Sequence, residues 1–401
     1  MGQTSKSDCD IWICIRRDDF NNGLREQLQE KARLIKDWLD TQIRMPVFFF
    51  HCNVEDIRDG NFGQVELESS GSAQKNVLKE EFYRTLILIC GKIPLWWVCW
   101  SPEGDISYEE TASGFARDGE SDHNFLDLGN IETVAPQEYF GATLWQFNKS
   151  LTQPLKSIIK MILLRMVVTS PAEELLCHSF RNHILAAGKQ PFIDPAFFVT
   201  RLAFDYLRGK DEKVFAFVRK CFYLSYDMKL LTKNVTYRET LAQDLFSGQG
   251  LEEREILHLN AFSDWNYQEQ IRFGTELFSL LRMIYSEINA LQGAMAGELT
   301  PRDVTVLGRK LASCLAQKPH KVPVLRKPMK NDNPPYITFK YANQGVWHTY
   351  PAEEESPPLM AHRDILYCIA YLVWNDALST DQVHMVPNIT AVTMQEIINM
   401  A

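Results

Sequence analysis

A short apolar run, Ile11 to Ile15, with two aspartates at its leading end, constrains the start of this chain more than any other feature. Its β-branched content predicts a buried strand. Because residues i and i+2 of a strand project to the same face, Asp8 and Asp10 should point together while Cys9 points away. Two carboxylates held so close are costly unless a cation lies between them, and Mg²⁺ is bound in this way with phosphate oxygens completing its shell. The pattern predicts a divalent-cation site, although Asp-x-Asp also occurs in solvated turns before strands.

A strand, helix, strand pattern fills the first fifty residues. Apolar residues recur at helical spacing from Leu24 to about Gln42, and Pro46 ends that helix. The run 47–50 predicts a second buried strand, which completes an α/β unit. Three further elements are predicted by composition and spacing: a loop rich in Gly and Ser over 58–74, a helix over 75–89 and a third strand over 95–100.

The second half of the chain is dominated by helical periodicity. Before the helical half, an acidic, polar stretch over 101–124 predicts a segment that lies on the surface. Helices are predicted over 138–149, from Pro154, and over 172–187, 195–208, 211–231, 237–247, 266–292 and 301–316. The helical periodicity ends near 331–335. After it, the sequence predicts a hairpin (336–341 with 346–350) and a helix near 361–377. We expect three parts, 1–105, 125–325 and 330–401.

Composition and charge narrow the class of protein. A net charge of −9 argues against a general nucleic-acid binder, which would show a basic excess or stripe. The first residues are polar, unlike a signal peptide, and the most apolar window, 86–100, is interrupted by Lys92 and Pro94 and is too short to span a bilayer. The nine cysteines include no Cys-x-x-Cys pair and most lie in apolar runs. This predicts free thiols in a reducing cytoplasm.

The segment from Gly2 to Trp12 resembles the catalytic loop and strand of the bacterial class I adenylate cyclases. The segment 138–149, Glu-Tyr-Phe-Gly-Ala-Thr-Leu-Trp-Gln-Phe-Asn-Lys, is similar to that family's signature Glu-Tyr-Phe-Gly-(Ser/Ala)-(Ser/Ala)-Leu-Trp-x-Leu-Tyr-Lys. Thr143, Phe147 and Asn148 depart from it. Segments 81–85, 91–92 and 219–224 also resemble the family, and the similarity runs in order from residue 2 to at least 350.

The resemblance implies an α+β fold with a nucleotidyltransferase-like mixed sheet, akin to DNA polymerase β, followed by a mainly helical domain and a small α+β segment. It also implies an enzyme that converts ATP to 3′,5′-cyclic AMP and pyrophosphate with Mg²⁺ or Mn²⁺. Asp8 and Asp10 would hold the metal ions, which lower the pKa of the ribose 3′-hydroxyl and stabilise charge on the leaving group. By the same resemblance, regulation by sugar phosphotransferase-system proteins would act through a C-terminal half beyond this sequence.

Five lysines and a serine are candidates for contacts with the nucleotide. Lys6 and Ser7 directly precede the aspartates, and Lys92 follows a glycine at a predicted strand entry. Lys149, Lys156 and Lys160 occupy consecutive predicted helices, where related nucleotidyltransferases bind triphosphate. Most have a simpler structural interpretation: a local turn for Ser7, a snorkelling side chain for Lys92 and solvated helix faces for the three lysines on predicted helices. Glu81 and Arg84 are expected to pair with each other or to brace the fold, and Trp12 to pack in the core.

Two departures from the family pattern bear on activity. The Gly-Ser motif that such nucleotidyltransferases carry upstream of the aspartates does not occur in this sequence, so we expect a fragment cut at both ends, inactive or badly impaired. The second strand ends at Asn53 where an aspartate is expected as a third metal-site position; Glu55 or Asp56 are the substitutes. Two other functions stay open, transfer of AMP to another acceptor and a catalytically dead nucleotide-binding or interaction module.

Overall fold

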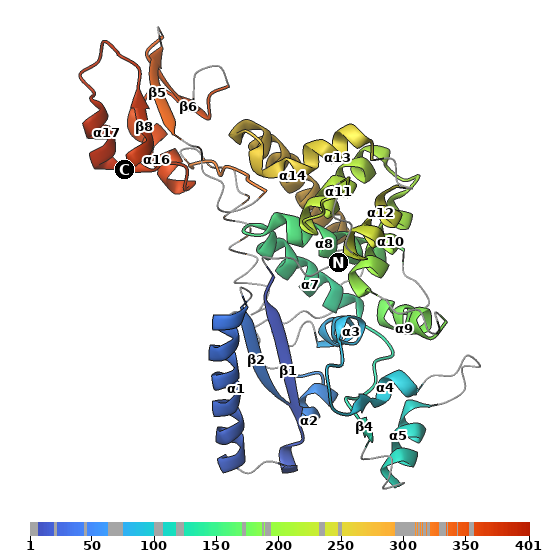
Figure 1. Ribbon diagram of the computed structural model, residues 1–401. Helices are drawn as coiled ribbons and strands as arrows, with labels where there is room; N and C mark the ends of the chain where they lie inside the picture. The colour runs from blue at the N-terminus through green and yellow to red at the C-terminus, as the bar shows by residue number, and fades with distance from the viewer. Residues whose placement is uncertain are drawn as a thin grey trace.

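The computed structural model describes most of the chain, and Figure 1 shows its course. The described residues are 7–19, 22–43, 46–62, 75–99, 107–117, 124–170, 174–186, 188, 194–231, 237–247, 251–292, 309, 311, 313, 315, 318, 321–328, 334, 336–342, 344–352 and 357–401. Among them, no helix is both long and apolar enough to cross a bilayer. Their eight cysteines are all free, and four of these are buried.

The chain begins with the predicted strand, helix, strand unit. Its elements are β1 (Cys9–Ile15), η1 (Arg17–Asp19), α1 (Asn22–Gln42) and β2 (Val47–Asn53). The two strands are parallel, with Cys9 opposite Val47 and Ile15 opposite Asn53. In Figure 1 the sheet starts beside the helical part of the molecule and runs away from it toward η1. Both strands and the long helix between them are therefore confirmed.

Short elements extend this N-terminal part. They are α2 (Val54–Arg58), α3 (Lys75–Thr85), β3 (Ile93–Pro94), α4 (Leu95–Val98), α5 (Tyr108–Arg117) and β4 (Phe125–Leu126), with β3 parallel to β4. The strand predicted over 95–100 is wrong, because 95–98 form a helical turn. Leu95 and Trp96 are consecutive and both buried, whereas a strand would direct them to opposite faces. Trp96 stacks on Tyr83 of α3 with ring centroids 4.4 Å apart.

The middle of the chain is helical, as predicted. Its elements are α7 (Pro136–Ser150), α8 (Pro154–Thr169), α9 (Leu176–Ala186), α10 (Pro195–Leu207), α11 (Glu212–Ser225), α12 (Tyr237–Ser247), α13 (Glu253–Asn260), η3 (Phe262–Asp264) and α14 (Tyr267–Gln292). One continuous apolar core joins them, with Ile158, Phe204, Phe222 and Leu281 fully buried in it. The short helix α13 was not predicted; a capping box of Glu252 and Glu255 starts it. The helix predicted over 301–316 lies mostly outside the described residues.

The C-terminal part is a small mixed sheet packed on a helix. It contains β5 (Ile337–Ala342), β6 (Val346–Pro351), β7 (Met360–His362), α16 (Ile365–Trp374), η4 (Thr380–Gln382), β8 (Val383–Met385) and α17 (Met394–Met400). The strand order is β7-β6-β5-β8, with β5–β6 antiparallel and β5–β8 parallel. The predicted hairpin and the helix after it are confirmed, and the chain as a whole has an α+β fold.

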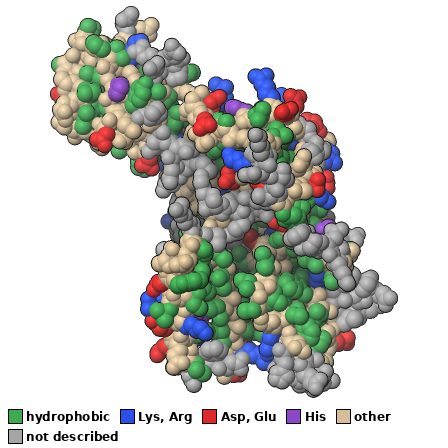
Figure 2. Space-filling model, viewed as in Figure 1, with side chains coloured by type: hydrophobic (Ala, Val, Ile, Leu, Met, Phe, Trp, Pro, Cys, Tyr) green, Lys and Arg blue, Asp and Glu red, His purple; other side chains and the backbone are tan. Residues whose placement is uncertain are grey.

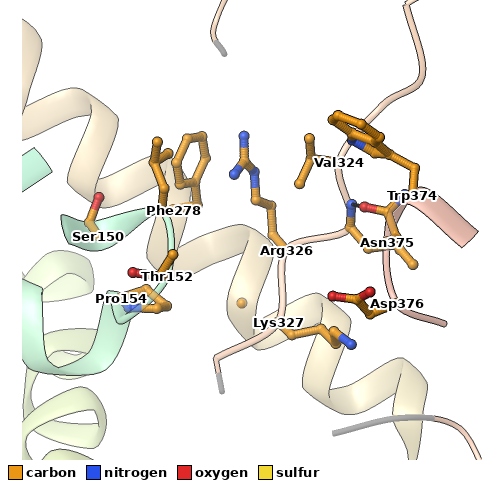
Figure 3. A pocket seen from close by; sticks show the side chains of 13 residues that line it. Ser150, Thr152, Pro154, Phe278, Val324, Arg326, Lys327, Trp374, Asn375 and Asp376 are labelled. Atoms are coloured by element: carbon orange, nitrogen blue, oxygen red, sulfur yellow. Dashed lines mark hydrogen bonds between the residues drawn. The ribbon is translucent and has the colours of Figure 1, made fainter. Parts of the chain in front are cut away.

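Residues 321–327, which we call the strap, lie between the helical and C-terminal parts. The side chain of Asn375 accepts a hydrogen bond from the Leu325 N–H (2.7 Å) and donates one to the Pro323 carbonyl (3.0 Å). On the other side the strap runs against α14, where a Cβ added at Gly274 would lie 2.2 Å from the Arg326 carbonyl oxygen. The strap and the end of α16 line a cavity of about 160 Å³, shown in Figure 3. Glycine at 274 is therefore what allows this close approach.

Candidate active site

The two aspartates lie at the end of β1 that is nearer to the helices. Asp8 directly precedes the strand, Asp10 is its second residue, and both are exposed, whereas Ser7 is buried. Within β1, Asp10 and Trp12 share one face of the strand, and Asp8 continues this spacing of two residues just before the strand begins. Trp12, the next residue on that face, packs on Phe82 of α3 with ring centroids 5.3 Å apart, as its predicted core role requires. The carboxylates thus lie just past the edge of an aromatic cluster, on the side of the sheet that α3 covers.

The structure does not bring Asn53 to this pair, contrary to expectation. In the parallel register Asn53 lies opposite Ile15, five residues beyond Asp10, or ~16 Å along the sheet. The reason is that parallel strands start at the same edge, so the end of β2 cannot meet the start of β1. Asn53 accepts a hydrogen bond from Arg25 (2.6 Å) and donates one to Asp56 (2.8 Å).

The two proposed substitutes for Asn53 lie at that same far edge. Glu55 accepts a hydrogen bond from the backbone N–H of Arg17, and Asp56 forms an ion pair of 3.0 Å with the Arg17 guanidinium. These contacts fix the start of α2 against η1. Glu55 and Asp56 therefore lie with Asn53 at the edge of the sheet opposite to the one where Asp8 and Asp10 lie.

The donor set at Asp8 and Asp10 fits a hard divalent cation in its chemistry, because both side chains are exposed and offer carboxylate oxygens at the start of β1. Mg²⁺ is commonly held by only one or two protein carboxylates, with water and phosphate oxygens as its other ligands. Over the described ranges, no three His, Cys, Asp or Glu side chains gather closely enough to hold a metal ion by themselves. The pair therefore suits a metal that arrives with its substrate rather than a closed protein site.

The candidate lysines of the helical part lie near the turn from α7 to α8. Lys149 is in the last turn of α7, with its ammonium 5.2 Å from the centroid of the Trp145 ring. Lys156 and Lys160 are exposed on α8, one turn apart and hence on one side of the helix. The structure thus groups these three lysines on two consecutive helices.

Lys160 forms an ion pair with Glu81 of α3, at 2.7 Å. The same glutamate is close enough to Lys149 and Arg84 for their charges to act on it. Lys160 first, then Arg84 and Lys149, lower the pKa of Glu81 to about 2 against the opposing effect of burial. Glu81 precedes Phe82, the residue that packs on Trp12, so α3 connects the aspartate face of β1 with the lysines of α7 and α8.

Glu81 and Arg84 were expected to pair with each other or to brace the fold, and the structure shows the bracing role for Arg84. Arg84 is instead bonded to Glu80, one turn earlier on the same helix, at 2.9 Å, and both side chains are buried. Glu80 lies four residues before Arg84 on the same side of α3, and the carboxylate of Glu81 is bound by Lys160 of α8 instead. Arg84 thus braces α3 and leaves Glu81 to the lysines.

Glu138, the first residue of the signature segment, ties α7 to α3. Its carboxylate accepts hydrogen bonds from the backbone N–H groups of Asn76 (2.5 Å) and Val77 (3.2 Å) and from the Asn76 side chain (2.8 Å). These are N–H groups of the first turn of α3, which have no partner within the helix. The glutamate therefore acts as a cap from outside the helix and fixes α3 against α7.

The remaining candidates are placed as follows. Lys92 is half-buried in the connection from α3 to β3, after Gly91, which has a φ of 97°. Lys6 lies outside the described residues. The role of Glu81 was missed because its partner, Lys160, is far away in sequence and no local pattern relates them.

The cavity of Figure 3 is separate from these groups. It is lined by the α7–α8 turn, α14, the strap and the end of α16, and none of Asp8, Asp10, Lys156 and Lys160 lines it. Arg326 extends across it, with its guanidinium 3.6 Å from the centroid of the Phe278 ring.

Two family models match consecutive parts of the chain. A family model described as "Adenylate cyclase NT domain" matches residues 1–97, and one described as "Adenylate cyclase, class-I, second domain" matches residues 134–326. The first covers β1, β2 and α3, and the second covers the helical part. No solved structure matches the chain.

Curated relatives of this chain are also named adenylate cyclases. The "Adenylate cyclase" of Escherichia coli (strain K12) is 27% identical over 380 residues, which cover 92% of this chain and 45% of that protein. The adenylate cyclase of Salmonella typhimurium (strain LT2) is 26% identical, over 96% of this chain and 47% of that protein. The adenylate cyclase of Haemophilus influenzae (strain Rd) is 29% identical, over 84% of this chain and 41% of that protein. The chain spans less than half the length of these relatives. With two consecutive domain models and these relatives in agreement, the chain belongs to the class I adenylate cyclase family.

Proposed function

We propose that this chain forms the nucleotide site of an adenylate cyclase, which converts ATP to 3′,5′-cyclic AMP and pyrophosphate. The observation that carries the proposal is that α3 links acidic and basic groups. Phe82 packs on Trp12, beside the Asp8 and Asp10 face, while Glu81 holds Lys160. A triphosphate needs both kinds of group, since cations neutralise its charge and carboxylates hold the metal ions.

In this proposal the ribose 3′-hydroxyl loses its proton to water and its oxygen attacks the α-phosphorus. A new bond forms between these two atoms, and the bond to the pyrophosphate oxygen breaks. Asp8 and Asp10 hold the divalent ions, Mg²⁺ or Mn²⁺, which when bound lower the pKa of the 3′-hydroxyl and offset charge on the leaving group. Lys149, Lys156 and Lys160 bind the β- and γ-phosphates.

Two weaker candidates complete this assignment. Ser7, buried directly before Asp8, offers its hydroxyl or backbone N–H to a phosphate oxygen, and Lys92 offers a further positive charge. We propose a nucleotidyltransferase-like sheet as the scaffold of this site. The parallel pairing of β1 and β2, with the aspartates at the start of β1, supports this proposal. Cytoplasmic location and regulation by sugar phosphotransferase-system proteins belong to the same proposal and follow from the family.

The test is metal-dependent ATP binding and turnover by the 401-residue chain. Asp10→Asn should lower Mg²⁺-dependent binding and any formation of cyclic AMP by about 100-fold, because one ligand charge is lost from the metal site. Asp18→Asn is the matched control: Asp18 is an exposed aspartate in η1, at the other end of the sheet.

Separating the products by chromatography distinguishes the alternatives. Cyclic AMP with pyrophosphate supports the proposal, and an adenylylated acceptor supports AMP transfer instead. ATP binding that is insensitive to metal and to Asp10→Asn would contradict the assignment of the aspartates.

A further inference from the structure

Two lysines on one side of α8 differ in their surroundings. Lys160 is ion-paired with Glu81 at 2.7 Å, with side chains 50% and 32% exposed. Lys156, one turn earlier, is exposed and makes no hydrogen bond or ion pair within the described part of the chain. A polyphosphate that approaches α8 therefore meets one lysine that is ready to bind and one that is already bound to a carboxylate.

Glu81 is held in place independently of Lys160. Its helix is fixed at its first turn by Glu138, on the sheet by the Phe82–Trp12 contact, and internally by the buried pair of Glu80 and Arg84. The position of α3, from which the Glu81 side chain extends, therefore does not depend on the ion pair with Lys160. Lys160 has the reach to change partners, because its four-carbon stem is flexible and longer than the side chain of the glutamate.

We propose that Glu81 is an internal competitor of the substrate triphosphate: it holds Lys160 in the free protein, and phosphate oxygens displace it on binding. The inference rests on the proposed function in taking the triphosphate as the ligand of Lys160. It makes Glu81 a positioning residue that lowers affinity for the polyphosphate, and so favours release of the pyrophosphate product. A site that held all its lysines unopposed would bind the product too tightly.

The electrostatics of the pair are consistent with this exchange. Lys160 and Lys149 hold the pKa of Glu81 well below its ordinary value, so the carboxylate is fully ionised at neutral pH. An ionised carboxylate both binds Lys160 and repels an incoming phosphate. Removing its charge while keeping its shape should therefore strengthen polyphosphate binding.

The experiment measures binding of Mg²⁺-tripolyphosphate, and separately of pyrophosphate, to the 401-residue chain by titration calorimetry. Glu81→Gln should tighten both by about three- to ten-fold, the size expected for a partly exposed ion pair and a like charge. Glu81→Asp, which keeps the charge, should restore weaker binding. In an active preparation Glu81→Gln should lower KM for ATP and the inhibition constant of pyrophosphate together.

A double-mutant cycle with two matched lysines gives the sharper test. In a Lys160→Met background the effect of Glu81→Gln should be clearly smaller than in the wild type, because only the direct repulsion between the carboxylate and the phosphate remains. In a Lys156→Met background the full effect should persist. Equal effects in both backgrounds would overturn the inference, as would weaker or unchanged binding by Glu81→Gln, or failure of both the wild type and Glu81→Gln to bind tripolyphosphate.

These outcomes separate the inference from the proposed function. If tripolyphosphate binding shows the expected coupling but ATP gives no cyclic AMP with any metal tested, the inference holds and the reaction assignment fails. If ATP is cyclised but Glu81→Gln changes no constant, the reaction assignment holds and the inference fails. Thermal unfolding of each variant confirms that differences in binding arise in folded protein.

Discussion

The helical part and the N-terminal part of the molecule are stabilised in different ways. The helices share one apolar core in which residues such as Phe204 and Phe222 are fully buried. The N-terminal part has a smaller core around Trp96 and buries three charged side chains beside it, Lys79, Glu80 and Arg84. The proposed site is therefore assembled from a rigid apolar scaffold that carries the lysines and a smaller unit, held partly by charges, that carries the aspartates.

The largest effect should come from the helical core. Phe204 contacts Phe215, Phe222 and Phe246 with ring centroids 5.4 to 5.7 Å apart and is fully buried. Phe204→Ala should lower the free energy of unfolding by about 4 kcal/mol, measured by urea denaturation. Phe82→Ala in the N-terminal part, where the ring is only partly buried, should cost clearly less. Equal losses would remove the contrast between the two cores.

The next effect tests the buried charges. Glu80→Gln leaves Arg84 without its ionic partner in a buried position and should cost about 3 kcal/mol. Arg33→Met breaks two exposed ion pairs, with Glu30 and with Asp37, whose side chains are each 56% exposed, and should cost less than about 1 kcal/mol. A loss at Glu80 as small as that at Arg33 would show that the N-terminal part does not depend on its buried ion pair.

Lys79 should make the N-terminal part sensitive to alkaline pH. Burial, with Lys75 and Arg58 nearby, lowers its pKa from 10.5 to about 8, against the opposite effect of Asp127 and Asp59. Between these values the unfolded chain binds more protons than the folded one, so the free energy of unfolding should rise with pH. The wild type should gain about 2 kcal/mol relative to Lys79→Met between pH 8 and 10.5, measured by denaturant melts. A difference that stays flat over this range would contradict the lowered pKa.

The smallest effect should come from the junction of the two parts. Glu138→Ala removes the outside cap of α3 and should cost about 1 kcal/mol. Glu138→Gln keeps an acceptor oxygen and should recover part of the loss. Hydrogen exchange at the amides of Asn76 and Val77 should rise in Glu138→Ala more than elsewhere in α3, and a uniform rise would argue against a local cap.

Much of the fold follows from periodicity. The strands β1 and β2, the helix α1 and most helices after Pro136 were predicted because their apolar residues recur at a strand or helix period over enough residues. The run 95–98 was not, because a short apolar segment after a proline fits a helical turn as well as a strand. Outside the described residues, Lys6 and most of the helix predicted over 301–316 stay predictions.

The site was predictable only in its local parts. The shared face of Asp8 and Asp10 and the shared side of Lys156 and Lys160 follow from spacing. The position of Asn53 depends on whether the two strands are parallel. The partner of Glu81 depends on how α8 packs against α3. No local sequence pattern encodes either of these. Tertiary packing decides both.

The absence of a side chain at Gly274 has a consequence for how the C-terminal part is retained. The backbone of Arg326 occupies the space that a methyl group would need, so even alanine there would force the strap away from α14. Such a variant would keep each folded part but expose the connection between them, and a protease would then detach β5 and everything after it. The hydrogen atom that stands in place of a side chain at Gly274 of α14 thus decides whether the last part of the chain behaves as a fixed unit or as a tethered one.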